Sequence, residues 1–248
     1  MLTLPPLLAR NVARLRRASA PAATSGSPLD SLIAPEIVGD RFHRSIMDVA
    51  ATPGVHQILE IGSSSGAGST EAWVAGALRN PIRPQLHCIE VSEARFDALV
   101  ERWREYDFVC CHHVSSVPLE SFPDPATVEA FYRGTRSKLR RTPLEDVLDW
   151  LRHDRDYVRE HDLSRRGIRE IREQHDIETF DAVLIDGSEF TGEAELDEVY
   201  GARFLLLDDT QTYKNYENAR RLESDPRYRI VVTSRRTRNG FAVFERVG

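Results

Sequence analysis

Short apolar runs alternate with segments of helical periodicity along most of the 248-residue chain. The apolar runs predict seven strands, at residues 56–61, 85–91, 108–114, 180–187, 203–209, 228–234 and 240–247. Strands that alternate with helices require right-handed crossovers and therefore a parallel sheet. The polar stretch between the last two runs ends in Asn239-Gly240, which favours a positive-φ turn and an antiparallel hairpin. The pattern predicts an α/β fold with a doubly wound, seven-stranded, mostly parallel sheet whose last strand is antiparallel.

The helices between these runs are predicted from apolar periodicity and capping residues. Apolar positions from about 31 to 51 recur at mostly helical intervals, and Pro53-Gly54 ends the pattern. Two further helices are expected at about 68–79 and 213–223, and Ser92 is placed to cap another.

A helical insertion is predicted at 118–178, between the third and fourth strands, because one crossover helix needs far fewer residues. Asp124 followed by Pro125 is typical of a helix start, and Thr142 with Glu145 forms a capping-box pattern. Such an insertion can act as a lid or substrate wall, or it can serve packing or pair two copies as a homodimer. The sequence leaves both roles open.

The chain is expected to comprise an N-terminal arm and linker at 1–30, followed by one domain at 31–248. Residues 7–18 can form a short amphipathic helix, and the small, polar segment 21–28 reads as a linker. Proline and arginine interrupt the apolar residues at the N-terminus, which makes a poor secretory signal.

Composition narrows the classes of partner. With 33 Lys and Arg against 39 Asp and Glu, the net charge of −6 argues against a nucleic-acid-binding surface. Three cysteines give no disulfide framework, and no stretch has the ~20 apolar residues that a membrane span needs. We therefore expect a cytoplasmic protein without nucleic-acid or membrane partners. The histidines His43, His112 and His113 show no metal-ligand spacing and are expected in the core or at its rim.

The segment "EIGSSSGAGST" places Gly62, Gly66 and Gly68 directly after the first strand and before a helix. Gly62 permits a tight exit from the strand, and the later glycines are expected to let the backbone approach a ligand closely. The helix N-terminus would offer free N–H groups to that ligand. The spacing differs from the dinucleotide pattern G-x-G-x-x-G, which disfavours a pyrophosphate site.

The stretch "LEIGSSSGAGST" resembles motif I of the class I S-adenosylmethionine-dependent methyltransferases. The resemblance implies S-adenosylmethionine as the cofactor and the strand order 3-2-1-4-5-7-6. It assigns the cofactor's methionine part to the loop, and its ribose hydroxyls to Glu90 at the end of "HCIEVS". After the third strand the family commonly has an acid near the adenine, where this chain has serines. The implied cofactor contacts are Glu60, Gly62, Ser63, Gly66, Gly68, Ser69, Glu90, Ser115, Ser116 and Asp186.

Carboxylates end two of the later strands: Asp186 ends the fourth, and Asp208 with Asp209 ends the fifth. The carboxyl ends of parallel strands lie on one edge, so these acids can converge beside the cofactor. Acids packed together repel unless a positive charge lies among them, and hard oxygen ligands suit Mg²⁺ or another divalent cation. Alternatively, Asp186 is the common fourth-strand acid of metal-free methyltransferases, and Asp209 caps the next helix.

The segment "IDGSEF" and the later acidic pair resemble the metal-dependent O-methyltransferases related to catechol O-methyltransferase, and the macrolide-sugar and cephalosporin-hydroxylase-like group. Glu189 stands where the sugar enzymes have a histidine base, so it is a candidate base, a fourth ligand or a surface residue. Lys214 and Asn215 are candidate substrate contacts.

The function predicted from the sequence is methyl transfer from S-adenosylmethionine to a hydroxyl of a small molecule, such as a sugar, a polyketide or a phenolic. A divalent metal would bind and acidify that hydroxyl, with Glu189 and Asp186 as the catalytic residues. The alternatives are a metal-free class I methyltransferase and an inactive cofactor-binding partner protein.

Overall fold

A computed structural model describes residue 29 and residues 31–247. The predicted arm at 1–30, with its helix at 7–18, therefore lies almost entirely outside the described residues. The described elements are, in chain order, α1 (Arg41–Ala50), β1 (Gln57–Ile61), α2 (Ser69–Ala77), β2 (Gln85–Glu90), α3 (Glu93–Trp103), β3 (Val109–His113), η2 (Leu119–Ser121), α4 (Pro125–Gly134), η3 (Lys138–Arg141), α5 (Leu144–Glu160), α6 (Gly167–Gln174), β4 (Ala182–Ile185), α7 (Gly192–Val199), β5 (Phe204–Asp208), α8 (Tyr216–Ser224), β6 (Tyr228–Ser234) and β7 (Phe241–Arg246).

The seven strands form one sheet in the order β3-β2-β1-β4-β5-β7-β6, as the family resemblance implied. The pairs from β3 to β5 are parallel, whereas β7 is antiparallel to both β5 and β6. The order reverses between β1 and β4, which is where open α/β sheets bind ligands at their carboxyl edge.

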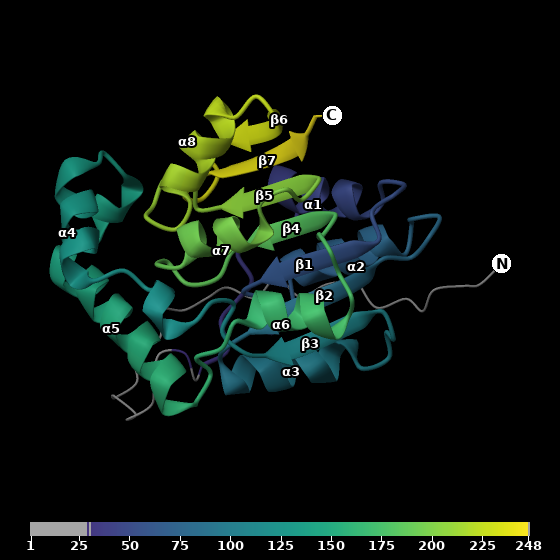
Figure 1. The fold of residues 1–248 in the computed structure, drawn as a ribbon, viewed down its shortest axis with the longest axis horizontal. Helices are drawn as coiled ribbons and strands as arrows, with labels where there is room; N and C mark the ends of the chain where they lie inside the picture. The colour runs from purple at the N-terminus through teal and green to yellow at the C-terminus, as the bar shows by residue number, and fades with distance from the viewer. Residues whose placement is uncertain (1–28, 30, 248) are drawn as a thin grey trace, which may run out of the picture.

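Helices cover both faces of the sheet (Figure 1). One apolar core joins the sheet to α1, α2 and α3, with Phe42 and Trp73 fully buried. A second core joins the opposite face to α6, α7 and α8. Because helices cover both faces, nearly all residues of the central strands β1, β4 and β5 are buried.

The predicted insertion is helical, and only part of it covers the sheet. Helix α6 packs on the sheet, whereas α4 and α5 share a separate apolar cluster that includes Val128, Leu151 and Phe190. Figure 1 shows α4 and α5 beyond the edge toward which the parallel strands point. This placement sets the insertion beside the ligand edge.

Two local predictions were wrong, and a third was right in part. Residues 31–40 are not helical: Gly39 has a φ of +64°, and Asp40 caps α1 by accepting a hydrogen bond from the N–H of His43. The capping box at Thr142 does not form, because α5 begins at Leu144 with Pro143 as its N-cap. The last hairpin is antiparallel and Gly240 has a positive φ, as predicted, but the other positive φ falls on Arg238 and not on Asn239.

No helix among the described residues combines the length and the apolar character that a membrane span requires.

The close packing of α1 against α2 gives a stability prediction. A Cβ added at Gly76 would lie 2.2 Å from the carbonyl oxygen of Met47, so the two helices would have to separate. We expect Gly76→Ala to lower the free energy of unfolding by about 1–3 kcal/mol, as overpacking does. Urea denaturation measures the change. Gly134→Ala is the control: within the described structure nothing lies within 4 Å of its added Cβ, and the change should stay below about 1 kcal/mol.

Candidate active site

A cavity of about 280 Å³ opens at the carboxyl edge of the sheet, beside the point where the strand order reverses. Its wall combines the glycine-rich loop, the strand ends and the insertion. The residues that line it include Ser63, Ser64, Ser65, Glu90, Ser115, Ser116, Phe122, Asp154, Val158, Asp186, Glu195, Asp209 and Lys214. The segment 33–37 closes another side. Residues from distant parts of the sequence therefore meet around one space.

The glycines of the loop are required by packing against the protein itself. A Cβ at Gly62 would lie 2.2 Å from the carbonyl oxygen of Asp186, and one at Gly66 would lie 2.6 Å from the indole nitrogen of Trp103. A Cβ at Gly68 would lie 2.9 Å from the carbonyl oxygen of Ile37. The later glycines were expected to let the backbone approach a ligand. In the structure, Gly66 and Gly68 instead allow close contact with neighbouring segments of the protein.

Glu60 is buried behind the glycine-rich loop. Its carboxylate accepts a 2.6 Å hydrogen bond from the hydroxyl of Thr70 in α2, and its Oε1 has no partner within the described residues. Burial raises the pKa of Glu60. The side chain ties β1 to the helix that follows the loop, which is a positioning role. Of the predicted loop contacts, Gly62, Ser63 and Ser69 line the cavity.

Glu90 ends β2 and lines the cavity with its carboxylate held on both oxygens. The N–H of Ser64 donates to Oε2 at 2.7 Å, and the N–H of Ser92 donates to Oε1 at 2.8 Å. Burial raises the pKa of Glu90, and the backbone donors oppose that shift. A carboxylate fixed in this way keeps lone pairs for two further donors, which is what a pair of ribose hydroxyls offers.

Glu195 of α7 is the acid that sequence reasoning missed. It lines the cavity, accepts from the hydroxyls of Ser116 at 2.6 Å and Thr191 at 2.8 Å, and keeps Oε2 unpartnered among the described residues. Ser115 instead donates to the carbonyl of Val117. Glu195 thus places a carboxylate beside the serines that follow the third strand. It lies in an acidic helix, where the sequence gives no signal to separate it from surface residues.

The three strand-end acids converge, as predicted. One carboxylate oxygen from each of Asp186, Asp208 and Asp209 lies within 4.8 Å of the others. The positive charge among them comes from the chain: the ammonium of Lys214 lies 2.8 Å from Asp186 and 2.9 Å from Asp209. Arg238 binds Asp208 at 2.8 Å. The carboxylates are therefore paired with a buried lysine and an arginine.

These pairings give the acids different proton affinities. Burial raises the pKa of Asp186 well above its ordinary value despite the neighbouring ammonium. Burial acts in the same direction on Asp209, but the ammonium of Lys214 together with Asn239 and Arg238 outweighs it, and the pKa is lowered. Asp186 is therefore the more basic of the two when both face the cavity.

Glu189 and Asn215 lie behind the cavity wall. Glu189 accepts from the hydroxyl of Thr212 at 3.2 Å and from the N–H of Lys214 at 3.3 Å. The amide of Asn215 donates to the carbonyls of Ile185 and Asp208, so it joins the ends of β4 and β5. Asn215 thus has a structural role here, and Lys214 is the predicted substrate contact that reaches the cavity.

No family model and no curated protein matches the chain. Solved structures do match. The O-methyltransferase from Bacillus cereus in complex with SAH (S-adenosylhomocysteine) is 14% identical, with 87% of this chain and 84% of that chain covered and a TM-score of 0.54. A protein from Corynebacterium glutamicum is 13% identical, with 88% and 84% covered and a TM-score of 0.50. The chain has the class I methyltransferase fold. At such low identity the likeness establishes the fold alone, and the strand order agrees with it.

Burial raises the pKa of Glu189 from 4.5 to about 7, which gives a pH prediction. A carboxyl with a raised folded pKa binds its proton more tightly in the folded state, so its contribution to stability falls as pH rises from about 4.5 to about 7. Glu189→Gln should therefore lose less stability than the unaltered chain over that range. Denaturation midpoints at several pH values measure this; parallel curves for the two proteins would contradict the shift.

Proposed function

We propose that the protein is an S-adenosylmethionine-dependent methyltransferase that methylates a hydroxyl oxygen of a small molecule. One observation carries the proposal: Glu90, fixed by the N–H groups of Ser64 and Ser92, shares a cavity with the Lys214 and Asp186 pair. The first group suits a ribose, and the second suits a reacting oxygen. The class I methyltransferase fold supports the reading.

The cavity residues fit the parts of the cofactor. Glu90 would accept both ribose hydroxyl protons, and the serines of the loop would face the methionine part, next to the N-terminus of α2. Ser116 and Oε2 of Glu195 would contact the edge of the adenine. This oxygen has no partner within the described chain. When bound, the cofactor supplies an activated methyl group on a sulfonium centre.

Lys214 and Asp186 would manage the acceptor hydroxyl. An ammonium has three N–H donors, and Asp186 and Asp209 take two of them, so the third can hold the acceptor oxygen in line for transfer. Asp186 would take the hydroxyl proton, since its raised pKa makes it the stronger base. Glu189, which the sequence suggested as a base, accepts from the backbone N–H of Lys214 behind the cavity wall and would act only through that residue.

The carboxylates are suitable donors for a divalent cation, but each already contacts a protein cation. An ion bound by Asp186, Asp208 and Asp209 would have to displace the ammonium of Lys214 and compete with Arg238. These contacts favour the metal-free form of the enzyme. The metal-dependent form is the second candidate, favoured by Oδ1 of Asp209, which is buried and lacks a partner in the described region.

The insertion would shape the acceptor end of the cavity. Phe122, Asp154 and Val158 come from it, and they line the cavity together with the segment 33–37. Such a mixed wall suits a small hydroxylated molecule such as a sugar, a polyketide or a phenolic. An inactive cofactor-binding protein would share the cavity and yield no methylated product.

Cofactor binding tests the proposal first. In Glu90→Gln, an amide N–H₂ group would face the backbone N–H of Ser64 or Ser92, so the ribose site would lose an acceptor and its fixed geometry. We expect S-adenosylmethionine and S-adenosylhomocysteine to bind at least tenfold more weakly, as measured by calorimetry. Glu93→Gln, at an exposed position in the next helix, is the control and should bind normally. Equal affinity in all three proteins would contradict the assignment.

Chelation separates the two forms of the enzyme. The metal-free form predicts that EDTA leaves transfer of a labelled methyl group to a panel of hydroxyl compounds unchanged. It also predicts that Lys214→Met, although destabilised by the two carboxylates left unpaired, abolishes transfer. Binding of S-adenosylhomocysteine by this variant then shows that the loss of transfer is not caused by unfolding. Loss of transfer in EDTA with recovery in Mg²⁺ would establish the metal-dependent form. No methylated product with any acceptor would favour the inactive binding protein.

A further inference from the structure

Three histidines from separate elements meet on the sheet face covered by α6. His87 comes from β2, His112 from β3, and His175 follows the last residue of α6. One ligand nitrogen from each lies within 4.8 Å of the others. Their ring centroids are 4.5 Å apart for His87 and His175, 5.4 Å for His87 and His112, and 5.9 Å for His112 and His175. The cluster thus joins two strands and the helix that covers them.

His87 is the most deeply buried member of the cluster. Its side chain is fully buried, and its Nδ1 lies 3.2 Å from Nε2 of His112. Its other nitrogen, Nε2, has no partner among the residues that the structure describes. An ion on Nδ1 would take the place of the contact with His112, so the approach of the three imidazole nitrogens, and not the unpartnered Nε2, indicates the site.

We propose that His87, His112 and His175 bind a divalent transition-metal ion of the Zn²⁺ class, at a site separate from the cofactor cavity. Two ligand nitrogens of a tetrahedral Zn²⁺ lie about 3.3 Å apart when each bond is about 2.0–2.1 Å. The distance between Nδ1 of His87 and Nε2 of His112 is 3.2 Å, which matches that spacing. His112, which the sequence placed in the core or at its rim, is thus a ligand, because the sheet supplies a partner that sequence spacing does not show.

The protonation state of the imidazoles suits a metal. Burial, followed by repulsion from the neighbouring imidazoles, lowers the pKa of His87 to about 3 and that of His112 to about 4. Both are therefore neutral at pH 7 and keep the lone pairs that a metal needs. His175 is the C-cap of α6, so the partial negative charge at this end of the helix lies beside the site and favours a cation there.

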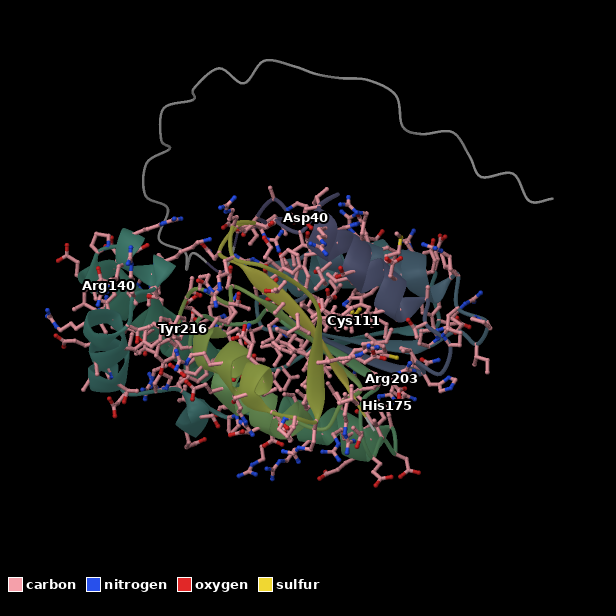
Figure 2. All side chains as sticks on the ribbon, turned by 90° about the horizontal axis from the view of Figure 1, so that it is seen from above. Asp40, Cys111, Arg140, His175, Arg203 and Tyr216 are labelled. Atoms are coloured by element: carbon pink, nitrogen blue, oxygen red, sulfur yellow. The ribbon has the colours of Figure 1, made fainter. Side chains whose placement is uncertain are left out.

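The site is open on one side, and none of the three histidines lines the cofactor cavity. His175 is exposed, so water can complete the coordination. Figure 2 shows His175 at the opposite end of the molecule from Arg140, which lies in the insertion. A bound ion would link β2 and β3 to the end of α6, so its effect should be on stability.

Zinc binding by the full-length protein tests the site. The metal-free protein is titrated with Zn²⁺ in competition with a chromophoric chelator, and Co²⁺ is added separately for its visible spectrum. We expect one tight site per chain, a tetrahedral Co²⁺ spectrum and a higher melting temperature with Zn²⁺. His175→Gln should weaken binding at least tenfold and abolish the thermal shift. Because His175 is exposed, this variant should fold without metal.

Two controls locate the ion. His56→Gln changes an exposed histidine outside the cluster, and Asp209→Asn changes the acidic group of the cofactor cavity. Both should keep the tight site and the Co²⁺ spectrum. The absence of stoichiometric binding would overturn the proposal, as would binding unaffected by His175→Gln or binding lost in Asp209→Asn. None of these outcomes depends on whether the protein transfers methyl groups.

Discussion

The buried ammonium of Lys214 allows two neighbouring strands to end in carboxylates at one edge of the sheet. Asp186 follows β4 and Asp209 follows β5, and the ammonium contacts both within 2.9 Å. Without it, two buried negative charges would face each other across the cavity wall, and removal of one partner from such a pair is strongly destabilising. The pairing therefore fixes both the ends of the strands and the charge of the cavity beside them.

This constraint also determines what the cavity can bind. The ammonium compensates two acids, Arg238 compensates the third, and Glu90 is fixed separately by backbone donors. The cavity thus presents one carboxylate suited to hydroxyl donors and one ion pair suited to a polar oxygen. A methyl donor and a hydroxyl acceptor match that division, because transfer to an oxygen needs alignment and a place for one proton.

The sequence predicted the fold because the alternation of apolar runs and helices, with the final hairpin, restricts the topology to few solutions. It also predicted that Asp186, Asp208 and Asp209 would meet, since parallel strands end at one edge. It could not predict Lys214 between them. Asp209 has a φ of +54°, and this local turn carries the chain back so that Lys214 reaches Asp186. Glu195 was missed for a similar reason, because only packing brings α7 to the cavity.

The most direct test is a crystal structure of the full chain with S-adenosylhomocysteine and Mg²⁺. The account predicts the ribose hydroxyls on Glu90, the sulfur facing the cavity side of Lys214, and the ammonium still between Asp186 and Asp209. A nucleoside bound away from Glu90 would contradict it. So would a cavity in which Lys214 has turned away and left its two carboxylates to an ion.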